Sequence, residues 1–97
     1  MAFVQIIEFR TTDIDAARRI DEEWRRATEG KRTARRELLA RDHSDPDRYF
    51  GIVFFDSYAS AMENSGLPET QAAAEQYRKI ADGPAVFYDL HVLEDWA

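Results

Sequence analysis

The stretch that most restricts the fold of this chain is residues 49–55, Tyr-Phe-Gly-Ile-Val-Phe-Phe, which is apolar at nearly every position. Aromatic and β-branched residues at this density predict a β-strand, whose side chains point alternately to the two faces of a sheet. Both faces are then apolar, one with Phe50, Ile52 and Phe54 and the other with Tyr49, Val53 and Phe55. Such a sheet needs a cover on both sides.

The rest of the chain predicts three more strands and two helices. The strands are expected at residues 3–9, 33–41 and 85–94. Thr12 or Asp13 can cap the first helix, which Gly30 ends, and Asp56 or Ser57 can cap the second, which ends near residues 82–84. The order β-α-β-β-α-β predicts an α+β, ferredoxin-like fold, in which a four-stranded antiparallel sheet has both helices on one face. We expect one domain over residues 1–97.

The second predicted helix is interrupted at Ser65-Gly66-Leu67-Pro68. Pro68 disfavours helical geometry at Leu67 and lacks a backbone donor, and Gly66 can turn the chain easily. One interpretation is that the break opens a ligand cleft between helix and sheet. The other is a simple kink that follows the curvature of the sheet.

The predicted helices can cover only one face of the sheet. The last strand is also apolar on both faces, with Val86, Tyr88 and Leu90 on one and Phe87 and Leu93 on the other. An exposed apolar face of this size is unusual for a monomer, and the same face of an identical chain is its simplest cover. We therefore predict a homodimer through the sheet face; the alternative is a monomer with some exposed aromatic side chains.

Composition excludes several classes of protein. The net charge of −6 argues against nucleic acid as a partner, because phosphate binding requires a basic surface. The chain has no cysteine, which excludes disulfides and thiolate metal sites. No apolar run approaches the ~20 residues that span a bilayer, and residues 1–4 have no signal-peptide features. We expect a cytoplasmic protein that does not bind membranes.

The segment Arg48–Ser57, running into Ala59–Met62, resembles the dimeric α/β-barrel superfamily, in particular the antibiotic-biosynthesis-monooxygenase-like proteins. The resemblance covers nearly the whole chain and implies a ligand cleft inside each subunit, between helices and sheet. The superfamily includes cofactor-free oxygenases of polycyclic phenols, haem-degrading enzymes and small isomerases. Its haem degraders carry a histidine in the second helix, and this chain has none there, so we predict no cofactor. The spacing of His43 and His91 also gives no metal site.

The resemblance and the residue types together give five candidate substrate-binding residues, which are Gln5, Trp24, Tyr49, Asn64 and Tyr77. Aromatic side chains can stack on a flat ligand, but those in an apolar stripe pack more often in the core. Gln5 and Asn64 occupy positions that face the cleft in the family. The alternative for Gln5 is a side chain hydrogen-bonded by neighbouring backbone.

His91 is the candidate catalytic residue, because Asp89 lies on the same face of the last strand and can tune an imidazole near neutral pH. If that face is the one covered by a second copy, His91 is instead a buried structural residue. Nine of the 13 Lys and Arg residues fall between Arg18 and Arg41. They can attract an anionic ligand, although the interspersed acidic residues favour an ion-paired surface.

These observations leave three functional hypotheses. The first is a small-molecule-binding homodimer that acts as a cofactor-independent monooxygenase on an aromatic or polyketide-like substrate. The second is a non-catalytic binding or structural dimer. The third is a small isomerase that uses His91 or a carboxylate to move a proton.

Overall fold

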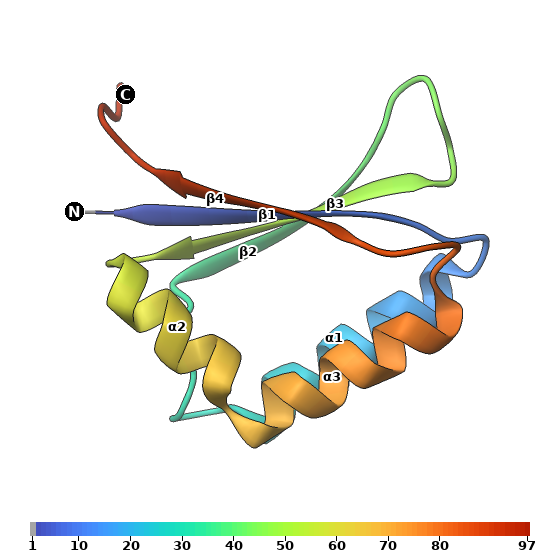
Figure 1. The fold of residues 1–97 in the computed structure, drawn as a ribbon, viewed down its shortest axis with the longest axis horizontal. Helices are drawn as coiled ribbons and strands as arrows, with labels where there is room; N and C mark the ends of the chain where they lie inside the picture. Colours follow the sequence, from blue (N-terminus) through green and yellow to red (C-terminus); the bar gives the residue numbers. More distant parts are fainter. Residues whose placement is uncertain (1) are drawn as a thin grey trace.

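The computed structural model describes residues 2–97, so Met1 of the predicted domain lies outside the described residues. Its elements are β1 (Phe3–Arg10), α1 (Ile14–Ala27), β2 (Arg36–Arg41), β3 (Arg48–Phe55), α2 (Tyr58–Gly66), α3 (Pro68–Ile80) and β4 (Val86–His91). The predicted order is confirmed, with the second helix divided into α2 and α3. All three helices lie on one side of the sheet (Figure 1).

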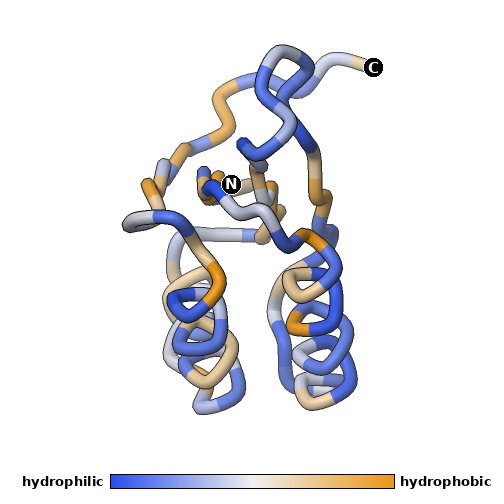
Figure 2. The backbone as a smooth tube through the Cα atoms, turned by 90° about the vertical axis from the view of Figure 1, so that its right-hand side faces the viewer, coloured by the Kyte–Doolittle hydropathy of each residue, from blue (hydrophilic) through white to orange (hydrophobic). Residues whose placement is uncertain are grey.

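The four strands form one antiparallel sheet in the order β2-β3-β1-β4. The two most apolar strands, β1 and β3, are therefore central. Under the sheet the helices stand as two columns side by side, and the C-terminus lies on the opposite side of the sheet (Figure 2). This arrangement confirms the predicted ferredoxin-like fold.

The helix starts follow from local capping. The Asp13 carboxylate accepts a hydrogen bond from Ala16 N (3.1 Å) at the start of α1. Ser57 and Ser60 form a reciprocal capping box at the start of α2. The prediction that Gly30 ends the first helix is wrong by three residues: α1 ends at Ala27, and Gly30, with φ +80°, makes the turn that follows.

Two predicted strands are shorter in the structure. The second strand was expected from Thr33, but Thr33 is held by α2, since its backbone N–H donates to Asn64 Oδ1 (3.2 Å) and its hydroxyl donates to the Ser60 carbonyl (2.6 Å). The last strand ends at His91, not at residue 94. One further backbone bond, from Val92 N to Ala2 O (3.0 Å), follows before the chain leaves the sheet.

The helix break lies where the sequence predicts it. Leu67 is extended (φ −63°, ψ 136°) and Pro68 is the first residue of α3, a position where a missing backbone N–H costs little. The Gln71 side chain donates to the Ser65 carbonyl (2.6 Å), which satisfies an acceptor at the end of α2. The expected turn at Gly66 is wrong, because Gly66 is the last helical residue and its φ is not positive.

The buried apolar side chains form two separate clusters, one at each end of the sheet. The α2-side core contains Phe3, Val53, Phe55 and Ala61. The α3-side core contains Phe9, Ala17 and Tyr49, with Ile14, Tyr77, Ile80 and Ala85 packed against it. Between the two clusters, Gln5 and Ile7 of β1 and Gly51 of β3 belong to neither core.

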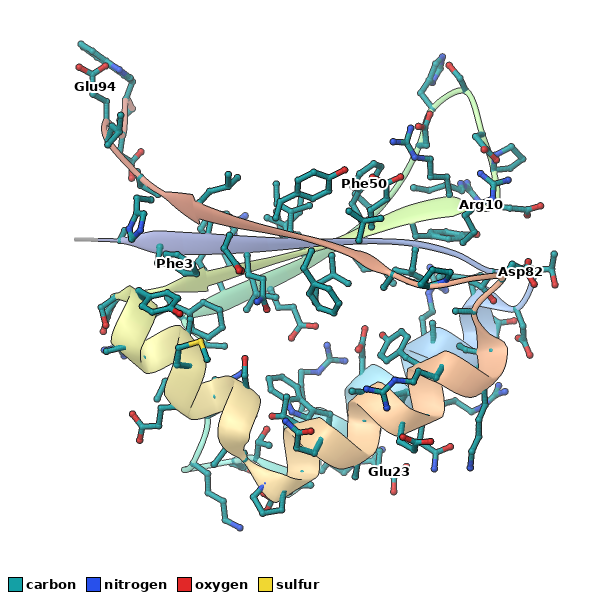
Figure 3. All side chains as sticks on the ribbon, in the orientation of Figure 1. Phe3, Arg10, Glu23, Phe50, Asp82 and Glu94 are labelled. Atoms are coloured by element: carbon teal, nitrogen blue, oxygen red, sulfur yellow. The ribbon has the colours of Figure 1, made fainter. Side chains whose placement is uncertain are left out.

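The sheet face opposite the helices, here called the outer face, is apolar, as predicted. In Figure 3, Phe50 points to this face and Phe3 points toward the helices. The register of the strands places Val4, Ile6, Leu38, Ile52, Phe54, Val86, Tyr88 and Leu90 with Phe50. Tyr88 and Leu90 are 42% and 45% exposed, and no helix of residues 2–97 covers them.

Candidate functional site

The helix-facing side of the sheet, here called the inner face, carries polar residues in its middle. The strand register aligns Glu37, Val53, Gln5 and Asp89 in one row across β2, β3, β1 and β4. Three of these four side chains are polar, and we call Glu37, Gln5 and Asp89 the inner polar row. A polar row between two apolar cores is costly to bury, so its place in the fold calls for a functional explanation.

The next row is open to solvent although it faces the helices. It contains Leu39, Gly51, Ile7 and Phe87, of which Leu39 is 37% and Phe87 is 59% exposed. A Cβ atom at Gly51 would meet only Ile7 atoms, the nearest at 3.9 Å. Its edge members Leu39 and Phe87 are therefore accessible, whereas Ile7 and Gly51 between them are partly buried.

Asp21 and Tyr77 bring helix side chains to this region. The Tyr77 hydroxyl donates to Asp21 Oδ1 (2.5 Å) and to the Ala17 carbonyl (3.3 Å). Burial raises the pKa of Asp21, while the Tyr77 hydrogen bond and the Arg25 charge oppose the shift. Burial and the neighbouring Asp21 also raise the pKa of Tyr77, so this phenol stays protonated and remains a donor.

Glu37 is the residue of the inner polar row whose pKa is affected by the charge of Asp21. Burial raises the pKa of Glu37, and the negative charge of Asp21 raises it further, against the opposing charges of Arg25 and Arg32. No hydrogen bond to the Glu37 side chain is found within residues 2–97. A carboxylate with a raised pKa and free lone pairs is suited to accept a proton from a bound molecule.

Gln5 lies on the inner face, as the family resemblance implies. Its amide Nε2 donates to Asp89 Oδ1 (3.0 Å), so its partner is a side chain of the neighbouring strand and not nearby backbone. This hydrogen bond fixes both side chains in the middle of the inner face.

His91 also lies on the inner face, paired in register with Phe3. Its ring meets the Phe3 ring edge-on (centroids 5.2 Å apart) and lies 6.4 Å from the Tyr58 ring. The interpretation that a second copy buries His91 on the sheet face is therefore wrong, since the residue is exposed on the helix side. Asp89 bonds Gln5, and among the described residues it makes no hydrogen bond to His91.

The structure places the remaining candidates mainly in packing roles. Trp24 is buried, and its indole N–H donates to Thr70 Oγ1 (2.9 Å), which joins α1 to α3. Tyr49 is buried and stacks on Phe9 (centroids 5.8 Å apart) in the α3-side core. Asn64 is buried and holds the loop before β2 through its bond from Thr33.

Asp21 and Glu37 are the site residues that the sequence analysis did not single out. A signal for Asp21 was present, because it falls between Ala17 and Trp24 in the buried stripe of the first helix. Glu37 had no such signal, because its neighbours on the same face of β2 are Leu39 and Arg41. An acidic residue at a core position is a stronger pointer to a site than an aromatic one.

Two shallow cavities border the helices. One, of about 180 Å³, lies between α1 and α3 and is lined by residues such as Ile20, Trp24 and Ala73. The other, of about 170 Å³, lies between the end of α1 and the start of β2, and Glu37 is part of its lining. Within residues 2–97, no group of three or more His, Asp or Glu side chains is placed to hold a metal ion. No helix in this part of the chain is long and apolar enough to cross a membrane.

No family model matches this sequence, and no curated protein matches it. Solved structures do match its fold. Rv0793 from Mycobacterium tuberculosis is 15% identical with a TM-score of 0.81, and the match covers 100% of both chains. A Chloroflexus aurantiacus protein assigned to the antibiotic biosynthesis monooxygenases is 20% identical with a TM-score of 0.76, over 100% of this chain and 98% of that one.

A third match carries a described activity. SnoaB, a cofactor-independent oxygenase from Streptomyces nogalater, is 11% identical with a TM-score of 0.75, and the match covers 97% of this chain and 95% of SnoaB. The chain therefore has the fold of the antibiotic-biosynthesis-monooxygenase-like proteins, as its strand and helix pattern predicted.

Proposed function

We propose that this protein is a homodimer that binds a small, planar, partly aromatic molecule on the inner face and removes a proton from it, as the first step of a cofactor-independent oxygenation. The observation that carries the proposal is the inner polar row, which lies between two apolar cores beside Asp21 and the solvent-accessible Leu39 and Phe87. The fold shared with SnoaB supports the reaction class.

Glu37 is the proposed base. Its carboxylate takes the proton of a phenolic O–H, which leaves a phenolate and a neutral Glu37 carboxyl group. The electron-rich ring carbon then reacts with O₂, and loss of water from the resulting hydroperoxide gives a ring carbonyl. In the balanced step the phenolic C–OH, one ring C–H and O₂ become two C=O groups and H₂O, so the substrate supplies all the electrons.

The apolar row around Gly51 suits a flat ring, since Leu39, Ile7 and Phe87 can contact its faces. The Gln5 amide is the proposed donor for a ring oxygen, because Nε2 carries two N–H groups and Asp89 accepts one of them. The bond to Asp89 already holds the amide in place, which reduces the reorganisation that substrate binding requires.

The homodimer is proposed from the outer face. Its half-exposed apolar side chains extend over all four strands, from Leu38 on β2 to Leu90 on β4. The same face of a second copy would remove this surface from water through a two-fold contact. Sedimentation at micromolar concentration tests this part, and a monomer would contradict it.

The reaction is tested by oxygen uptake with a panel of polycyclic phenols in metal-free buffer. We expect Glu37→Gln to bind the reactive phenol with unchanged affinity and to lose at least about 100-fold in oxygen uptake, the range of a lost general base. Glu29→Gln, the same change on an exposed residue after α1, is the control. Equal uptake by wild type and Glu37→Gln would refute Glu37 as the base.

A second candidate function is proton-shuttling isomerisation. It is favoured by the carboxylate of Glu37, which makes no hydrogen bond among the described residues and could take a proton from one carbon of a substrate and return it to a neighbouring carbon. Exchange of substrate hydrogen for deuterium in D₂O under argon, with no oxygen uptake in air, would select this function over oxygenation.

A further inference from the structure

The cavity between α1 and β2 is lined mainly by basic residues, although the protein as a whole is acidic. The chain carries a net charge of −6, yet the cavity of about 170 Å³ is lined by four arginines and a single acid: Arg25, Arg32, Ala34, Arg35, Arg36 and Glu37. A concave surface with several guanidinium groups concentrates anions even when the whole molecule is acidic.

Most of these arginines are not neutralised by the protein itself. Arg35 pairs with Asp56 at 2.5 Å, so its charge is already neutralised by the protein. Arg25, Arg32 and Arg36 form no salt bridge among the described residues. The ion-paired surface expected from the sequence therefore holds for Arg35 and not for the rest of this cavity.

Of the arginines that line the cavity, Arg25 has the guanidinium group with the fewest other contacts. Arg32 donates to the Arg25 carbonyl (2.7 Å) at the end of α1, and its guanidinium lies 5.8 Å from the centroid of the Trp24 ring. The Arg36 guanidinium lies over the Phe54 ring, 5.8 Å from its centroid, and so on the outer face of the sheet, away from the cavity. The Arg25 charge acts instead on Asp21 and Glu37 without a direct bond to either.

Glu37 connects this cavity to the proposed reaction site, because it lines the cavity and also begins the inner polar row. A ligand held in the cavity by its anionic group therefore has Glu37 beside it, and beyond Glu37 lie the Gly51 row and the exposed Phe87. Arginine binds carboxylates in a planar, two-bond geometry, which would also fix the plane of an attached ring.

We infer that the cavity between α1 and β2 binds the carboxylate of an aromatic acid, with Arg25 as its main partner and Arg32 as the second, so that the ring reaches the inner polar row. The position of the ring rests on the proposed function, whereas carboxylate binding at Arg25 does not. The proposed substrate is thus a phenol that carries a carboxylate group, and not a neutral phenol.

The test compares a hydroxynaphthoic acid with the naphthol that lacks its carboxylate, in calorimetric titrations under argon so that no turnover occurs. We expect wild type to bind the acid at least about tenfold more tightly than the naphthol, the order of a charge-assisted pair. In Arg25→Gln the two affinities should come within about threefold of each other, and Arg25→Lys should restore part of the preference.

Arg26→Gln is the matched control, because Arg26 is the next residue of α1 and pairs with Glu22 (3.8 Å) on the exposed side. It should keep the full preference for the acid. Inorganic phosphate at the same concentration should not displace the acid; displacement with equal affinity would assign the cavity to phosphorylated ligands and overturn the carboxylate. Thermal melts of each variant confirm that the fold is retained.

The outcomes separate this inference from the proposed function. Equal binding of acid and naphthol by wild type overturns the carboxylate site, even if both compounds then consume oxygen. A preference for the acid that depends on Arg25, without oxygen uptake in air, keeps the carboxylate site and refutes the oxygenation.

Discussion

The two faces of the sheet are built from the same four strands, but their polar side chains stand in different places. On the outer face most charged residues gather at one end, where Arg48 binds both Glu8 and Asp42 at 2.9 Å and the Tyr88 hydroxyl donates to Glu8 at 2.9 Å. On the inner face Glu37, Gln5 and Asp89 cross the middle of the sheet.

The difference supports the proposed dimer contact on the outer face and the proposed site on the inner face. Outer-face charges satisfy one another and leave the central surface apolar, which suits a flat contact with another copy. Inner-face polar groups interrupt the core and leave Glu37 without a hydrogen bond among the described residues. Polar groups placed where they weaken packing are expected at functional sites.

The largest effect should come from a charge on the outer face. Ile52→Asp places a carboxylate in the centre of the proposed dimer contact, where burial without a partner costs several kcal/mol. We expect a monomer at concentrations where wild type is a dimer, measured by sedimentation. Met62→Asp, a similar change at an exposed site on α2, should leave the assembly intact. An unchanged mass for Ile52→Asp would remove the distinction between the faces.

A smaller effect should follow from filling the middle of the inner face. Gly51→Leu adds a side chain in the open row, where a Cβ meets only Ile7 atoms at 3.9 Å or more. We expect aromatic-ligand affinity to fall by at least about tenfold, while the free energy of unfolding changes by less than about 1 kcal/mol. Ligand titration and urea unfolding of the same variant measure both. Undiminished affinity would show that ligands bind elsewhere.

The pH dependence of stability should sharpen the comparison further. The pKa of Asp21 is raised in the folded protein, mainly by burial, so its stabilising contribution is complete below the unfolded value of 3.8 and is lost as the pH rises through the folded pKa. Asp21→Asn keeps an acceptor for Tyr77 and removes this loss. We expect the variant to be more stable than wild type at neutral pH and to gain nothing near pH 3.

The measurement is the difference in unfolding free energy between Asp21→Asn and wild type across pH, from urea titrations. Carboxyl groups paired with arginine, such as Asp56 with Arg35, have a lowered pKa and the opposite slope, but they are common to both proteins and cancel in the difference. A difference independent of pH would show that Asp21 has an ordinary pKa in the folded protein.

The smallest effect is expected at the helix break. Pro68→Ala restores a backbone donor at the first residue of α3, so we expect a change in unfolding free energy within about 1 kcal/mol. Under the cleft interpretation the association rate of the aromatic ligand changes more than stability does, which stopped-flow fluorescence can measure. Equal rates in the two proteins would favour the simple kink.

The features that the sequence predicted correctly depend on the restricted backbone of proline and on the alternation of side chains along a strand. Pro68 fixes the break because its ring excludes helical geometry at Leu67, and the two-sided apolar strands follow from the spacing of Phe50, Ile52 and Phe54. Neither conclusion requires knowledge of which strands are neighbours.

The parts that the sequence did not predict depend on long-range pairing. The face of His91 is decided by its register with Phe3, which joins the two ends of the chain. The bond between Tyr77 and Asp21 likewise joins residues of two different helices. Local patterns contain no information on such contacts, so the helix stripe could mark Asp21 as buried but could not give its partner Tyr77.

The division of the buried side chains into two clusters has a mechanical consequence. The α2 end and the α3 end are linked by the sheet, by the extended residue Leu67 and by the Gln71–Ser65 hydrogen bond, and no side chain belongs to both clusters. Separation of α2 from its strands would therefore expose Phe3, Val53 and Phe55 and leave the α3-side core packed.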